Sequence, residues 1–188
     1  MKMTRVVVAF LAIAAIAAAL VPAPAALAQG AEGPAECRGG KAAGHPCKNI
    51  DLLSHVAVGA VADVWGWVDP ETKKEYAVLG TTRGAQFLDV SDPENPVHLG
   101  TLLGKPETAL IWVEIEILNN HMYMVCDLSP CNLQIFDLTR LSGVESAVPV
   151  WRPDVVYPFG TFHSIGSNPD TDHIFLNGIG AVVGSPAG

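Results

Sequence analysis

A pattern that recurs after 48 residues constrains the fold of this chain more than any other feature. Ala85–Asp92 (AQFLDVSD) and Leu133–Arg140 (LQIFDLTR) each place an aliphatic and an aromatic residue before an aspartate, followed by an aliphatic and a hydroxyl residue. A third unit begins at Phe162, which lies 50 residues after Trp112. A period of about 40 to 50 residues with several short strands per unit is typical of β-propeller blades. Such units must pack against one another, because one unit alone cannot bury both faces of its sheet.

Short apolar runs separated by turn residues indicate that the units consist of strands. Residues 112–118 (WVEIEIL) alternate strictly, which puts the glutamates on one face and the aliphatic side chains on the other. The remaining predicted strands are 63–67, 76–80, 85–90, 97–103, 121–126, 133–138, 162–165 and 173–177.

The sequence therefore predicts an all-β fold, a partial β-propeller of about two and a half blades. The first unit covers residues 63–110, the second 111–160 and an incomplete third 161–188. They follow a Gly/Ala/Glu linker at 29–36, expected to be disordered, and a cysteine-bounded segment at 37–62. Because a propeller typically needs at least about four blades, we expect a truncated product or gene fragment. If the chain is complete, we expect either an oligomer or an open sheet with poorly protected edges.

Residues 1–28 have the pattern of a secretory signal peptide. A basic start precedes an uninterrupted apolar run over Val6–Val21, and the small residues of Ala26–Ala28 suit a signal peptidase. The pattern predicts cleavage between Ala28 and Gln29. The apolar run is short for a membrane span, which needs about 20 residues. We therefore expect an extracytoplasmic protein, secreted or at the cell surface, with no membrane span in the mature chain.

The charge of the chain disfavours two classes of partner. The formal net charge is −8 at pH 7. Nucleic acids and anionic membrane surfaces attract basic surfaces, so we expect neither as a partner.

Four cysteines in an exported chain favour disulfides over free thiols. Cys37 and Cys47 bound a loop rich in glycine, and Cys126 and Cys131 bound a second loop. Four cysteines allow three pairings, of which the two local ones are favoured. Neither spacing fits a zinc site well.

Several segments together resemble the choice-of-anchor B family, whose members carry LVIVD-type repeats. They are Cys37 with 47–56 (CKNIDLLSHV), 65–67 (WGW), 75–77 (EYA), 87–97 (FLDVSDPENPV) and 134–141 (QIFDLTRL). The resemblance implies an exported, surface-associated β-propeller without established catalytic chemistry. We expect the chain to depart from the family in having fewer blades and no C-terminal anchoring segment. It also has Trp112–Glu114 where a Trp-Arg-Asp triplet is more typical.

Two groups of acidic residues could hold a calcium ion weakly. Residues 168–172 (NPDTD) resemble the start of a calcium loop but lack its glycine and its final glutamate. Asp89, Asp92 and Glu94 stand by a proline-rich turn, which explains them without an ion. We therefore expect no cofactor and no catalytic or metal-binding residue, with a weak structural calcium ion as the alternative.

Three further features have a structural explanation. His163 and Ser164 are adjacent on a predicted strand and point to opposite faces, so they cannot pair as base and nucleophile. Residues 178–184 (GIGAVVG) resemble a dinucleotide-binding loop, but we expect a turn there, because Pro186 disfavours the helix that such a loop precedes. Four tryptophans could stack on a carbohydrate, although packing between blades is favoured: Trp65, Trp67, Trp112 and Trp151.

The sequence favours an exported, non-enzymatic repeat protein that acts as a binding module for a protein or a carbohydrate. One alternative is a propeller-type metal-dependent hydrolase similar to lactonases, with metal ligands on its inner strands. The other is a nonfunctional fragment.

The signal peptide yields a direct prediction. The exported protein should begin at Gln29, which the intact mass of the secreted chain checks. Ala28→Trp should block cleavage, because signal peptidase requires a small residue there, whereas Ala31→Trp, beyond the cleavage site, should leave the processing unchanged. An exported chain that still carries residues 6–21 would contradict the prediction.

Overall fold

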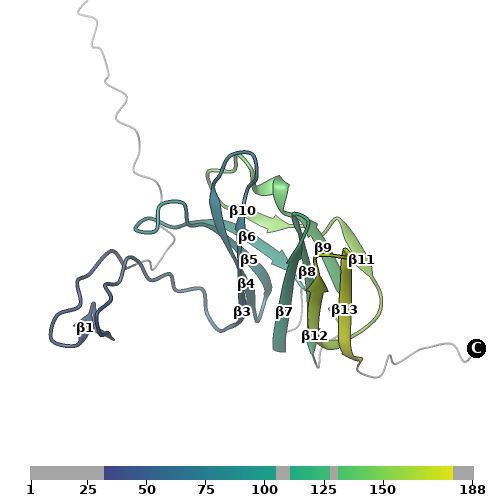
Figure 1. Cartoon of the computed structure of the whole chain (residues 1–188), viewed down its shortest axis with the longest axis horizontal. Coiled ribbons are helices and arrows are strands. Elements are labelled where there is room, and N and C mark those ends of the chain that lie inside the picture. Colours follow the sequence, from purple (N-terminus) through teal and green to yellow (C-terminus); the bar gives the residue numbers. More distant parts are fainter. Residues whose placement is uncertain (1–31, 105–110, 128–130, 180–188) are drawn as a thin grey trace, which may run out of the picture.

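The computed structural model in Figure 1 describes residues 32–104, 111–127 and 131–179. Over these residues the chain is all-β, with one short 3-10 helix, η1 (Leu138–Leu141). The predicted signal peptide and its cleavage site at Ala28 and Gln29 lie outside the described residues. Within the described ranges, no helix is long and apolar enough to cross a membrane.

The first sheet is built mainly by consecutive strands. β3 (Val61–Val68), β4 (Glu75–Thr81), β5 (Gly84–Asp89) and β6 (Val97–Leu103) pair antiparallel, each with the next. A fifth strand, β10 (Val148–Trp151), pairs parallel with β6 at the far edge. This strand comes from the second repeat, so it ties the two repeats together.

The second sheet repeats this antiparallel order. β7 (Ile111–Leu118), β8 (His121–Asp127), β9 (Leu133–Asp137) and β11 (Val155–Tyr157) lie side by side. The strands β5 and β9, which carry the recurring pattern, are each third in their sheet.

Two smaller sheets complete the described part of the chain. β12 (Phe162–Asn168) and β13 (His173–Ile179) form an antiparallel pair, the third sheet. β1 (Lys41–Ala42) and β2 (His45–Pro46) form a short hairpin in the N-terminal segment, to one side of the larger sheets (Figure 1). None of the described sheets closes on itself.

The recurring Asp-x-Ser/Thr pattern forms turns. The Asp89 carboxylate accepts a hydrogen bond from the Ser91 amide at 3.0 Å, and the Asp137 carboxylate accepts one from the Thr139 amide at 2.9 Å. Aspartate side chains favour such turns because they bond the backbone two residues later. The pattern therefore ends a strand in both repeats.

The main core lies between the first and second sheets. Phe87 of β5 stacks on Phe136 of β9, with ring centroids 4.8 Å apart. Trp151 of β10 meets both rings edge-on and donates an indole hydrogen bond to the Leu99 carbonyl at 2.9 Å. The same cluster includes the buried aliphatic and methionine side chains Val78, Leu102, Val113, Ile115, Met122, Met124, Leu138 and Leu141.

The opposite face of the second sheet is also buried. Val125 of β8 and Leu133 of β9 form a second cluster with Phe162 of β12. The neighbouring residues Met122 and Met124 of β8 belong to the first core. Because β8 is covered on both faces, its sequence is a continuous apolar run and does not alternate with polar residues.

The first strands of the three sheets are neighbours. β7 contacts β3 on one side and β12 on the other (Figure 1). The three sheets thus follow one another in sequence order, each packed on the next. Polar side chains on these first strands are described below.

Asp69, in the turn after β3, connects the two repeats through hydrogen bonds. Its carboxylate accepts a bond from the Ser142 hydroxyl, just beyond η1, and others from the Thr72 hydroxyl at 2.7 Å and the Glu71 amide at 2.9 Å. These bonds, the one from Ser142 first among them, lower the pKa of Asp69 to about 2.

The lowered pKa of Asp69 predicts an acid-dependent loss of stability. Its folded pKa lies below the unfolded value of about 3.9, so its contribution is present above about pH 4 and is lost as the pH falls toward 2. Asp69→Asn should lower the unfolding free energy at pH 7 and flatten its decline in acid, as urea unfolding from pH 2.5 to 7 can measure. Ser142→Ala should reproduce part of both effects. An Asp69→Asn variant with the wild-type pH dependence would contradict the assignment.

Candidate functional site

A carboxylate on the first strand of the first sheet reaches the second sheet. Asp63 Oδ2 accepts a hydrogen bond from the Ile115 amide on β7 at 2.8 Å, and Oδ1 accepts one from the Val64 amide at 2.8 Å. β7 is the edge strand of its sheet, so Asp63 takes the place of a neighbouring strand. An edge amide is thereby satisfied without strand pairing.

Two contacts between side chains join the second and third sheets. His163 Nδ1 on β12 lies 2.7 Å from Asp127 Oδ2 on β8. The Ser167 hydroxyl on β12 donates to Glu116 Oε1 on β7 at 3.0 Å. We call the polar side chains on and beside the three first strands the polar row: Asp63, Glu114, Glu116, Asp127 and His163.

Glu114 lies within the polar row and has an altered acidity. Partial burial raises its pKa, the negative charge of Asp63 raises it further, and His163 acts in the opposite direction. Burial disfavours the charged carboxylate and a nearby like charge adds to the effect. The row therefore concentrates negative charge beside one histidine.

A glycine allows the first and second sheets to approach closely. A Cβ atom at Gly80 of β4 would lie 2.7 Å from the Val113 carbonyl oxygen of β7. It would also contact the Asp63 side chain at 3.4 Å. Glycine is therefore needed where β4 passes β7.

A cavity of about 280 Å³ adjoins this point of approach. It lies at the starts of β3 and β7 and the end of β4, lined by Ala60, Val61, Ala62, Thr81, Thr82, Trp112 and Val113. The strand register shifts between Ile111 and Val113, and Trp112 in the bulge adopts a positive φ of 48°. A bulge of this kind redirects a side chain, and here the indole is 54% exposed at the cavity.

The tryptophans divide into two groups, so the prediction that they pack in the core is only half correct. Trp67 and Trp151 are 6% and 9% exposed and belong to the main core. Trp65 and Trp112 are 36% and 54% exposed. For Trp112 the reason is the bulge, which interrupts the predicted alternation at its first residue, while Val113 and Ile115 enter the core as predicted.

Both predicted disulfides are present with local pairing. Cys37 pairs with Cys47, and Cys126 pairs with Cys131. The first disulfide anchors the N-terminal hairpin, and the second closes the connection from β8 to β9.

The acidic groups considered for calcium form turns instead of gathering around one point. Asp89 forms an ion pair with Lys74 at 2.8 Å, and Asp92 accepts a hydrogen bond from the Glu94 amide at 3.0 Å. Asn168 accepts one from the Asp170 amide at 3.0 Å in the same way. The glycine-rich segment 178–184 lies outside the described residues from position 180 onward.

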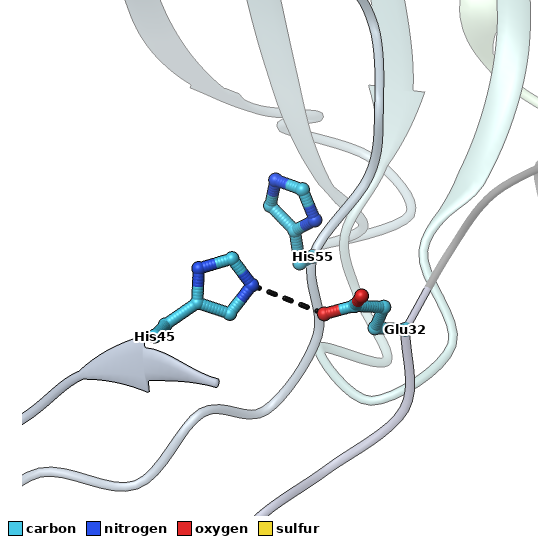
Figure 2. Close-up of side chains that lie close together, drawn as sticks. All are labelled: Glu32, His45 and His55. Atoms are coloured by element: carbon cyan, nitrogen blue, oxygen red, sulfur yellow. Dashed lines mark hydrogen bonds and ion pairs between the residues drawn. The ribbon is translucent and has the colours of Figure 1, made fainter. Parts of the chain in front are cut away.

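Three side chains that the sequence did not predict as ligands have the geometry of a metal-binding site. Glu32, His45 and His55 each offer a ligand atom, and these atoms lie within 4.8 Å of one another (Figure 2). Across residues 32–104, 111–127 and 131–179 this is the one group of three such side chains so arranged, and the polar row does not form another. The two histidines flank Cys47 in sequence, but Glu32 becomes their neighbour only through folding.

Comparisons with known proteins gave no match. No protein-family model, no curated protein and no solved structure matches this chain. The resemblance to the choice-of-anchor B family accordingly stays a prediction from the sequence motifs.

The close approach at Gly80 predicts a large difference between two neighbouring glycines. Gly80→Ala should destabilise the protein by about 1–3 kcal/mol, because the added methyl group overlaps backbone that cannot move freely. Gly66→Ala on β3 is the matched control, since a Cβ atom there would have no other atom within 4 Å. It should be neutral or stabilising by up to about 1 kcal/mol through the unfolded chain. Equal urea midpoints for the two variants would argue against the observed packing of β4 on β7.

Proposed function

We propose that this chain is an exported, non-enzymatic binding module built from propeller-type repeats, as its resemblance to choice-of-anchor B proteins implies. Its partner would be a carbohydrate or a protein that contacts the exposed Trp112 and the adjoining cavity. The proposal has three supports, which concern the arrangement of the repeats, the disulfides and the surface at Trp112.

The arrangement of the sheets supports propeller-type repeats. In each of the first two sheets, four antiparallel strands lie side by side in chain order, with β10 added in parallel to the first sheet. The second sheet is covered on both faces. Their first strands, β3 and β7, are neighbours, and β12 of the third sheet lies beyond β7. Radially repeated blades have this relation of inner strands and facing sheets.

The disulfides support an extracytoplasmic location. Disulfides form and persist in oxidising compartments and are rare in the reducing cytosol. Both cysteine pairs of this chain are oxidised in the structure, which agrees with an export signal at residues 1–28.

The observation that carries the binding function is the conformation of Trp112. A positive φ at a residue other than glycine costs on the order of 1 kcal/mol or more and concentrates at functional sites. Here it holds a large indole in solvent beside a cavity. An exposed aromatic ring can stack on a sugar or anchor a protein contact. A neutral carbohydrate is favoured, because it needs no basic surface and the chain has a net charge of −8.

The competing hydrolase function would have to use the polar row. Asp63, Glu114 and His163 are on the first strands, where a propeller hydrolase would hold its metal ligands. In the structure, however, Asp63 accepts a hydrogen bond from the Ile115 amide. His163 contacts Asp127. The hydrolase function therefore requires Glu114, whereas the binding function requires Trp112.

Titration with neutral cello-, chito- and manno-oligosaccharides, followed by tryptophan fluorescence and calorimetry, tests the proposal. Binding should weaken by about tenfold or more in Trp112→Ala, because an aromatic contact contributes on the order of 1 kcal/mol beyond its burial. Trp65→Ala is the matched control, since Trp65 is exposed but does not line the cavity, and it should bind as the wild type does.

A lactone-hydrolysis assay with added Ca²⁺ or Zn²⁺ distinguishes the hydrolase function from the proposed binding function. Turnover that Glu114→Gln abolishes would overturn the proposal in favour of the hydrolase. Oligosaccharide binding that Trp112→Ala leaves unchanged would move the binding surface elsewhere. If none of the oligosaccharides binds, carbohydrates are excluded as the partner and a protein remains the proposed one.

A further inference from the structure

We infer that Glu32, His45 and His55 form a binding site for one Zn²⁺ ion in the N-terminal segment, residues 32–58. His45 Nε2 lies 3.0 Å from Glu32 Oε2, and the rings of the two histidines are 4.9 Å apart at an angle of 50°. In Figure 2 the His45 ring and the Glu32 carboxylate face each other, and the His55 ring lies beside them on a third stretch of chain. The site is separate from the polar row and does not depend on the proposed binding function.

The backbone holds Glu32 and His55 directly opposite each other. The Glu32 amide donates to the His55 carbonyl at 2.8 Å, and the His55 amide donates back to the Glu32 carbonyl at 3.1 Å. A second reciprocal pair joins Ala35 and Leu52 at 2.8 and 3.0 Å. The predicted linker at 29–36 is thus paired from residue 32 onward, which places the carboxylate beside the imidazole.

The disulfide and the hairpin position His45. β1 and β2 pair Ala42 with His45, and the Cys47 amide donates to the Gly40 carbonyl at 3.0 Å. The Cys37–Cys47 bond closes this loop at its base. The Cys37 amide donates to Asp51 Oδ1 at 2.8 Å, which connects the loop to the stretch that carries His55.

The chemistry of the three ligands selects a transition metal. Two imidazole nitrogens and one carboxylate oxygen are a common zinc ligand set, in which the fourth tetrahedral position stays open to water or another ligand. Calcium and magnesium instead require six or more oxygen ligands. Imidazole ligands suit zinc, as they suit copper, iron and nickel.

The distances fit a site that closes on the ion. Ligands about 2.0–2.1 Å from a tetrahedral zinc ion lie about 3.3 Å apart. Glu32 and His45 are already at 3.0 Å, and all three ligand atoms are within 4.8 Å. The side chains of His45 and Glu32 are 45% and 50% exposed, so small rotations can bring the remaining atoms into contact with the ion.

The N-terminal segment also lacks the core that would otherwise stabilise it. Over residues 32–58 the single buried apolar side chain is Ala42, at 2% exposure, whereas Ile50 and Leu53 are largely exposed. Small segments with little core are commonly stabilised by disulfides or a structural metal ion. The Cys37–Cys47 bond is the disulfide of this segment. The zinc ion would be its structural metal ion and would connect residue 32 to residues 45 and 55.

Calorimetry and equilibrium dialysis of the mature, disulfide-bonded protein with Zn²⁺ after chelator treatment test the inference. One ion should bind per chain. Loss of a residue that only supports a metal ligand weakens metal binding by roughly 10- to 100-fold. His45→Ala and His55→Ala each remove a ligand and should weaken Zn²⁺ binding by more than this, and Glu32→Gln should weaken it measurably. His173→Ala is the matched control, because His173 is exposed and bonds its own turn at the Thr171 carbonyl. Ca²⁺ should not compete for the site.

Co²⁺ substitution and limited proteolysis provide readouts that do not depend on affinity alone. The visible spectrum of the Co²⁺ protein should be that of a tetrahedral site and should disappear in His55→Ala. Zn²⁺ should protect residues 32–58 from proteolysis in the wild type and in His173→Ala, but not in the double variant His45→Ala/His55→Ala. All three ligands are at least partly exposed, so these variants should keep the wild-type circular dichroism of the sheets.

Two results would overturn the inference. The first is the absence of stoichiometric Zn²⁺ binding, which would leave His45 and Glu32 as a surface ion pair of the usual small stability. The second is unchanged binding in His45→Ala/His55→Ala, which would place the ion elsewhere. If that binding were lost in Glu114→Gln instead, the metal would belong to the polar row and the competing hydrolase function would gain support.

Discussion

The second sheet is buried on both of its faces. One face packs on the first sheet through Phe87, Phe136 and Trp151, and the other packs on Phe162 of the third sheet. A single four-stranded sheet would leave one of these faces in water. β10 strengthens the first contact, because it leaves the second repeat to pair with β6 and brings Trp151 into the core. The repeats therefore stabilise one another and cannot be understood separately.

This packing brings the edges of the first strands together, and the polar row follows from that constraint. An edge strand carries unpaired amides, and Asp63 satisfies one of them on β7 while Gly80 allows the close approach. Beside them the bulge at Trp112 turns an indole outward over the cavity. The N-terminal segment follows a different principle. It has almost no core, so its shape depends on a disulfide, paired backbone and the convergence of Glu32, His45 and His55.

The parts of the structure that local patterns determine were predicted from the sequence, and the parts that depend on distant contacts were not. The strands at 76–80, 85–90, 97–103 and 121–126 agree with β4, β5, β6 and β8, because apolar runs and turn residues define them locally. β10 and β11 were missed, since Pro149 lies within β10 and the valines of both strands are exposed or half-buried, so neither carries a strand pattern. β10 is stabilised by pairing with β6. The alternation of β7 was predicted, but the bulge at Trp112 was not. The zinc ligands were missed because Glu32 meets the histidines only through backbone pairing across the segment.

The face-to-face packing of the first and second sheets can be tested by a double-mutant cycle between Phe87 and Phe136. These residues are 49 positions apart in sequence and stack with ring centroids 4.8 Å apart. Phe→Leu at each position and at both retains an apolar core, so urea unfolding can be measured for all four proteins. Stacked rings should show a coupling energy of about 0.5–1.5 kcal/mol. Additive effects, with a coupling below about 0.3 kcal/mol, would mean that the two rings do not meet and would contradict the stacked arrangement of the repeats.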